Sequence, residues 1–89
     1  MRYANRRDAN DAEIIDYVLA LGYWTWKADP PAPFDYIVGR GSNPTVVFLE
    51  IKTKLGKLTG NQVNFKKLAR TFTEARTPEE ARAGIEKWI

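Results

Sequence analysis

The segment Val46–Lys54, with the sequence VVFLEIKTK, constrains the fold of this chain more than any other stretch. Successive side chains of a β-strand point to opposite faces of the sheet. One face of this strand would be wholly apolar, with Val47, Leu49 and Ile51. The other face would turn polar only at its C-terminal end, at Glu50 and Lys52. A half-exposed strand would be polar along a whole face. Either an ion pair marks the point where this strand leaves the sheet, or the strand end carries a functional site.

Length and composition restrict the chemistry that is available to the chain. Its 89 residues suit one small domain with a limited core. It has no apolar run long enough to span a bilayer and no signal-peptide pattern, so we expect a cytoplasmic protein. It has no cysteine and no histidine, which excludes disulfides, thiolate and imidazole metal sites, and histidine general bases. A metal site would need oxygen ligands, which favours Mg²⁺ or Mn²⁺.

The net charge of +3 is small, but the basic residues are clustered. The clusters are Arg2, Arg6 and Arg7, then Lys52, Lys54 and Lys57, then Lys66, Lys67 and Arg70. Such clusters indicate a polyanionic partner such as nucleic acid, or a solvated surface.

Periodicity and turn signals predict three helices and four strands. We expect helices over residues 11–21, 60–69 and from 78 onward, and strands over 23–27, 34–38, 45–53 and 72–76. Thr59 with Gln62, and Thr77 with Pro78, are typical of helix starts. The helix after Thr59 is expected to bury Val63, Phe65 and Leu68. The turn GRGSNP predicts an antiparallel hairpin between the second and third strands.

That hairpin would place Asp35 opposite Glu50, within about 5 Å laterally. Two carboxylates so close repel each other unless a cation lies between them. Lys52 supplies one positive charge, and a hard divalent ion would supply more. Such a group is suited to phosphodiester hydrolysis by metal-activated water.

The pattern Asp35, then Glu50-Ile51-Lys52, resembles the PD-(D/E)XK nuclease superfamily. The segments FDYIVGRG and FLEIKTKLGKLTGNQVNF are similar to the VRR-NUC branch and its small phage-type relatives. The segment RDANDAEII also resembles the start of that family's N-terminal helix. One position departs from the pattern, because Phe34 stands where the family has a proline and Pro33 lies one residue earlier.

The resemblance implies an α/β domain over residues 1–89 with a restriction-endonuclease-like fold, in which helices flank a central mixed sheet. Its element order would be α-β-β-β-α-β-α, with residues 1–9 as a flexible basic arm. The implied metal ligands are Glu13, Asp35, Glu50 and the backbone carbonyl of Ile51. Lys52 would position the attacking water, and Gln62 would orient Lys52 or touch the phosphate. The family's phage-type members imply action in a host cytoplasm.

Several of these residues have a purely structural alternative. Glu13 could instead complete a capping box with Asn10, and Gln62 one with Thr59. The basic residues Arg6, Arg7, Lys54, Lys57 and Lys66 would contact nucleic acid, or would be solvated. Trp24 and Trp26 would stack on bases, or form part of a core or dimer surface.

The sequence therefore predicts a Mg²⁺- or Mn²⁺-dependent DNA endonuclease without an organic cofactor. A chain this small offers little surface for DNA, so we expect a homodimer that cuts branched, flapped or junction DNA, as a Holliday junction resolvase does. The first rival is a non-catalytic nucleic-acid-binding module with the same fold. The second is a structural subunit that uses the tryptophans as its contact.

Overall fold

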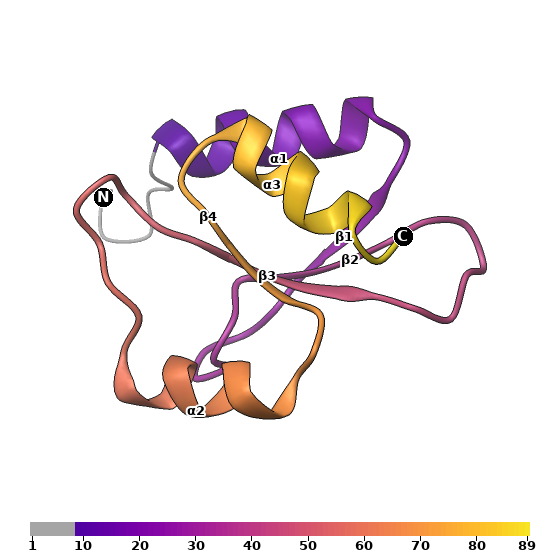
Figure 1. Cartoon of the computed structure of the whole chain (residues 1–89). Helices are drawn as coiled ribbons and strands as arrows, with labels where there is room; N and C mark the ends of the chain where they lie inside the picture. Colours follow the sequence, from indigo (N-terminus) through magenta and orange to yellow (C-terminus); the bar gives the residue numbers. More distant parts are fainter. Residues whose placement is uncertain (1–8) are drawn as a thin grey trace.

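The computed structural model describes residues 9–89, in which three helices and four strands alternate in the predicted order (Figure 1). The helices are α1 (Ala9–Ala20), α2 (Gly60–Leu68) and α3 (Pro78–Glu86). The strands are β1 (Trp24–Lys27), β2 (Tyr36–Gly39), β3 (Val47–Ile51) and β4 (Phe72–Ala75). Apart from Ala9, which opens α1, the predicted basic arm lies outside the described residues. No helix within residues 9–89 is long and apolar enough to cross a membrane.

The four strands form one mixed sheet in the order β1-β2-β3-β4. β1 pairs with β2 and β2 pairs with β3 in antiparallel fashion, whereas β3 and β4 run parallel. Helix α2 lies in the connection between the two parallel strands, as a crossover requires. The predicted α/β class and the β2–β3 hairpin are confirmed.

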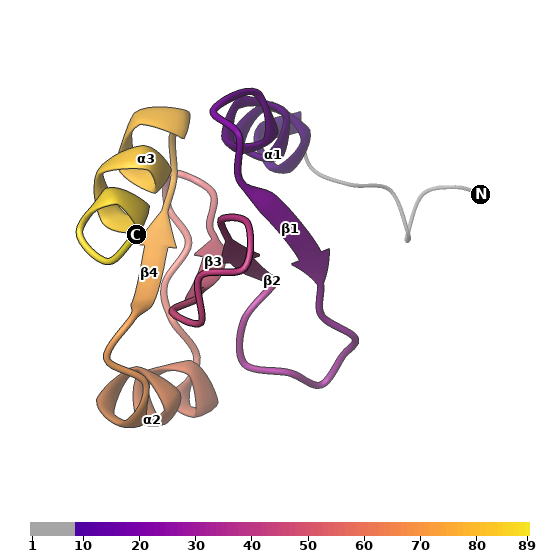
Figure 2. The same ribbon diagram turned by 90° about the vertical axis from the view of Figure 1, so that its right-hand side faces the viewer.

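Two helices cover one face of the sheet and the third covers the other (Figures 1 and 2). α1 and α3 lie together over the main core, which includes Ile14, Val18, Val38, Val47, Leu49, Ala81 and Ile85. Gly84 on α3 lets the helix approach β4 closely, because a Cβ there would lie 2.3 Å from the Thr73 methyl carbon. The apolar face of β3 predicted from the alternation is therefore buried against α1 and α3.

The face toward α2 holds a smaller aromatic cluster formed by Phe34, Phe48, Phe65 and Phe72. The ring of Phe65 on α2 lies 5.4, 5.2 and 5.9 Å from the rings of Phe34, Phe48 and Phe72. The prediction that Val63 and Leu68 would be buried is wrong, since they are 40% and 85% exposed. α2 has nine residues, none of them fully buried, and Phe65 is its aromatic contact with the sheet.

Capping residues define the starts of α2 and α3 as predicted. Thr59 Oγ1 accepts from the Gln62 backbone N–H, and Gln62 Oε1 accepts from the Thr59 N–H. Thr77 Oγ1 likewise accepts from the Glu80 N–H. Each cap satisfies backbone donors that the first helical turn leaves unpaired.

Candidate functional site

Asp35 and Glu50 come together where β2 begins and β3 ends. The β2–β3 register pairs Tyr36 with Leu49 as its last pair, and Asp35 and Glu50 are the next residues along the two strands. Asp35 lies in a bend before β2, not inside the strand as expected. The cause of this bend is a local side-chain contact. Asp35 Oδ2 accepts from the Ile51 N–H at 2.8 Å, in place of the backbone carbonyl that a regular strand would use. The Asp35 N–H donates to the Leu49 carbonyl at 2.9 Å, which fixes the residue against β3.

Glu50 is a buried carboxylate, only 4% exposed. Burial raises the pKa of Glu50 above its ordinary value of 4.5, and the negative charge of Asp35 raises it further. Hydrogen bonding and charge attraction from Lys52, and a hydrogen bond from Gln62, act in the opposite direction without cancelling the rise. The fold thus places two carboxylates where their joint ionisation is unfavourable, an arrangement that a cation would relieve.

Lys52 supplies the ammonium group of the site. Its Nζ lies 3.2 Å from Glu50 Oε2, and its side chain is 16% exposed. The backbone of Lys52 is held from two directions beyond the end of β3. Its N–H donates to the Ala75 carbonyl at 3.0 Å, and its carbonyl accepts from Asn10 Nδ2 at 2.9 Å. These contacts fix the peptide that presents the amine.

Gln62 has the capping role that the sequence offered and also borders Glu50, while its contact with Lys52 or a phosphate remains a prediction. Its Oε1 completes the capping box with Thr59, and its side chain lies near enough to Glu50 to lower the pKa of that carboxyl. Since the oxygen accepts from Thr59, the amide NH₂ is the part of Gln62 that can act favourably on the Glu50 carboxylate. The start of α2 is in this way tied to the candidate site on β3.

Glu13 is not brought into the same group. Within residues 9–89 there is no cluster of three or more acidic, histidine or cysteine side chains able to hold a metal ion. Glu13 is exposed on α1, which covers the opposite face from α2 (Figure 1). The capping-box alternative with Asn10 is also wrong, because Asn10 lies within α1 and its amide donates to Lys52 instead. That contact, which bridges from the first turn of α1 to the end of β3, had no signal in the sequence.

The predicted nucleic-acid contacts occupy different places. Lys54 and Lys57 are exposed on the loop between β3 and α2, and Lys66 is exposed on α2. Arg6 and Arg7 lie outside the described residues. The position of the Ile51 backbone carbonyl as a ligand remains a prediction, while the Ile51 N–H is already bonded to Asp35.

Arg76 holds the loop between β3 and α2 that carries Lys54 and Lys57. The sequence did not predict this contact. Its Nη2 donates to the Gly56 carbonyl at 2.6 Å and lies 2.7 Å from Glu74 Oε2. The loop that carries Lys54 and Lys57 is thereby attached to the end of β4. The only sequence signal for this brace is the alternation of Glu74 and Arg76 at the end of a predicted strand.

Trp24 and Trp26 lie on β1, at the opposite edge of the sheet from β4. Trp24 donates from Nε1 to the Gly41 carbonyl at 2.9 Å and packs against Gly39. Trp26 is 70% exposed. Both tryptophans are therefore separated from Glu50 by β2.

Comparison with known proteins found no matching family model, no similar curated protein and no similar solved structure. The functional interpretation therefore rests on the residues and their geometry.

Proposed function

We propose that this protein is a Mg²⁺- or Mn²⁺-dependent DNA endonuclease with a restriction-endonuclease-like fold, similar to the VRR-NUC branch. The observation that carries the proposal is the buried Glu50 carboxylate, which lies close enough to Asp35 to be affected by its charge and 3.2 Å from the Lys52 amine. The Asp35 bond to Ile51 and the Glu50–Lys52 ion pair do not by themselves require a second carboxylate beside the buried Glu50. A carboxylate pair beside an ammonium group does suit the binding of a cation and a phosphate.

The donor set fits a hard divalent cation. Mg²⁺ is commonly held by one or two carboxylates, with waters and substrate phosphate oxygens completing its shell. Asp35 uses Oδ2 to hold the Ile51 N–H, which leaves Oδ1 for a ligand. Glu50 is oriented by Lys52 and Gln62. Asp35 and Glu50 are therefore the residues that would hold the ion, and the exposed Glu13 would contribute at most through water.

Each side chain has a distinct role in the proposed hydrolysis. A bound divalent ion activates water and neutralises charge on the phosphate. The Lys52 ammonium orients the attacking water and stabilises the charge that develops on the phosphate oxygens. Gln62 lowers the pKa of Glu50 and so favours its ionised, metal-binding form. Asn10 acts as a positioning residue, since it holds the Lys52 carbonyl.

The substrate class follows from the size of the protein and its charge. Specific protein–DNA interfaces bury about 1,000 Å² or more of protein surface, which is large for a chain of this length. A homodimer would double the contact surface and supply two cutting sites. We therefore favour branched, flapped or junction DNA, cut by a dimer within the cytoplasm.

The test is cleavage of branched and linear DNA in Mn²⁺ or Mg²⁺, with EDTA as one control and Lys52→Ala as the other. Lys54→Ala is the matched variant, because Lys54 is a neighbouring lysine on the exposed loop. We expect cutting by the native protein and by Lys54→Ala. Loss of an electrostatic contact to the transition state lowers the rate by about 10²–10³-fold, so Lys52→Ala should be nearly inactive.

Three outcomes would contradict the proposal. DNA binding without cutting, with Lys52→Ala and Lys54→Ala equally weakened, would identify the non-catalytic binding module. Cutting that survives both EDTA and Lys52→Ala would come from a contaminating nuclease. Absence of DNA binding at low salt would leave the structural-subunit alternative, since phosphate contacts are strongest there.

A further inference from the structure

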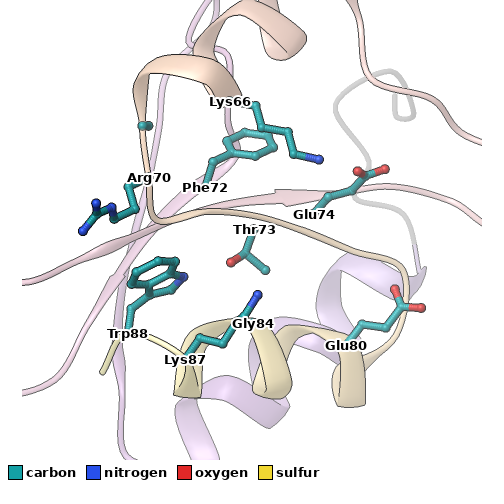
Figure 3. A pocket seen from close by; sticks show the side chains of 10 residues that line it. Lys66, Arg70, Phe72, Thr73, Glu74, Glu80, Gly84, Lys87 and Trp88 are labelled. Atoms are coloured by element: carbon teal, nitrogen blue, oxygen red, sulfur yellow. The ribbon is translucent and has the colours of Figure 1, made fainter.

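A cavity lies beside the candidate site, on the far side of β4. It has a volume of about 430 Å³ and is enclosed by the end of α2, by β4 and by α3 (Figure 3). Cavities of about 300–1,000 Å³ are typical of sites that hold small molecules. The space is larger than an isolated anion needs.

Three basic side chains line this cavity: Lys66, Arg70 and Lys87. All three residues are exposed, and none has an ion-pair partner within residues 9–89. The cavity also has two acidic residues, but Arg76 engages both of them. Glu74 lies 2.7 Å from the Arg76 guanidinium, and Glu80 accepts from the Arg76 backbone N–H at 2.7 Å. The positive charge is therefore available to a ligand, whereas the negative charge is already engaged.

The cavity has a basic and aromatic end. In Figure 3, Arg70 and Trp88 stand at one end, and Glu74 and Glu80 stand at the other. Trp88 is half-buried and packs against the main core, so its ring has a fixed position. An indole ring near Arg70 and the Lys87 amine, with Lys66 farther along the cavity, suits a planar base attached to a phosphate.

The cavity is adjacent to the proposed cutting site. Glu74, which lines it, is the register partner of Glu50 on the neighbouring strand. Lys66 lies one helical turn after Gln62, so the same face of α2 runs from the candidate site to the cavity. A nucleic acid strand seated at Glu50 would therefore pass the cavity mouth.

We propose that this cavity binds one unstacked nucleotide of a single-stranded segment, with Lys66, Arg70 and Lys87 on its phosphates and Trp88 against its base. A paired base inside a duplex cannot enter a cavity, whereas a splayed base of an unpaired strand can. The inference rests on the proposed nuclease function and deepens it, because it makes an unpaired strand beside the cut the feature that is recognised.

The test measures binding in EDTA, so that its result does not depend on cleavage. A labelled single-stranded oligodeoxynucleotide and the blunt duplex of the same sequence are titrated with Lys66→Ala, Arg70→Ala and Lys87→Ala. Lys67→Ala is the matched control, because Lys67 is equally exposed on α2 but does not line the cavity. A lost charged hydrogen bond corresponds to about ten-fold weaker binding, which is expected for the single strand with each cavity variant. The salt dependence should fall by about 0.7 in slope per lost contact.

A separate measurement tests the proposed contact between Trp88 and the base. The native protein should bind an oligonucleotide with bases more tightly than an abasic strand of the same length. Trp88→Leu should abolish this difference and Trp88→Phe should retain it, with circular dichroism showing that both variants are folded.

Three results would overturn the inference: equal losses for Lys67→Ala and the cavity variants, equal losses for duplex and single strand, or a base preference that survives Trp88→Leu. The nuclease proposal is tested separately, by DNA cleavage with the native protein and with Lys52→Ala. Lys52 does not line the cavity, so failure of nucleotide binding and failure of the nuclease proposal give different results.

Discussion

The Gln62 side chain on α2 lies beside the buried Glu50 carboxylate on β3 and lowers its pKa, against the rise that burial and Asp35 cause. The same side chain accepts from the Thr59 N–H at 2.9 Å, so one amide joins the start of a helix to the candidate site. Exchange of its NH₂ group for an oxygen would keep the contact with Thr59 and turn the contact with Glu50 into a repulsion.

We therefore expect Gln62→Glu to retain the helix cap but to place a negative charge beside Glu50. This like charge should raise the pKa of Glu50 further and reduce stability at neutral pH, with recovery as the pH falls. Gln62→Ala, which loses both contacts, should cost about 1 kcal/mol at any pH above the titration of Glu50. Thermal unfolding of both variants across the pH range checks this, and a Gln62→Glu variant as stable as the native protein at pH 7 would contradict the contact with Glu50.

Glu50→Gln should stabilise the metal-free protein at neutral pH. The pKa of Glu50 is raised in the folded state, so its ionised form opposes folding above that pKa, and the cost disappears below the ordinary value of 4.5. Glutamine removes the charge but keeps the size, and a gain of ~1 kcal/mol would raise Tm by about 4–8 °C in a domain of this size. The gain should vanish in acid. Thermal unfolding in EDTA at neutral and acidic pH tests this, and a variant less stable than the native protein at both would show that Glu50 is favourably ionised.

Mn²⁺ should raise the Tm of the native protein and leave Asp35→Asn unchanged. Asparagine can still accept from the Ile51 N–H, so the variant isolates the charge of Asp35 from its structural bond. Ligand at 100 times its Kd stabilises the folded state by about 2.7 kcal/mol. Asp35→Ala is the companion variant and should lose about 1–3 kcal/mol without metal, because the Ile51 donor is left unpaired. An equal Mn²⁺ shift in the native protein and Asp35→Asn would place the ion elsewhere.

Gly84→Ala should destabilise the protein, although alanine is the better helix former by about 1 kcal/mol. The new Cβ would lie 2.3 Å from the Thr73 Cγ2 atom, so α3 must shift away from β4. Overpacking of this kind costs about 1–3 kcal/mol. Urea unfolding of Gly84→Ala, Thr73→Ala and the double variant measures it. Thr73→Ala removes the atoms in closest conflict, so a double variant that recovers no stability would locate the effect elsewhere.

The sequence by itself determined the elements and their order. Turn and capping residues such as Thr59 and Thr77 act within a few residues, so their effect is visible locally. The alternation in β3 and the short turn after β2 also predicted the antiparallel hairpin that brings Asp35 near Glu50. Helix caps and hairpin pairing both depend on short-range geometry, so both can be predicted from the local order of residues.

Only the tertiary structure decided which side chains share the site. The Asn10 bond to Lys52 and the Arg76 bond to Gly56 join residues 42 and 20 positions apart. The exposure of Val63 and Leu68 likewise depends on how much of α2 the sheet can cover. The cavity between α2, β4 and α3 exists only once these three elements pack, because no single segment encloses it. Burial and long-range contacts are properties of the packed chain, and local patterns do not encode them.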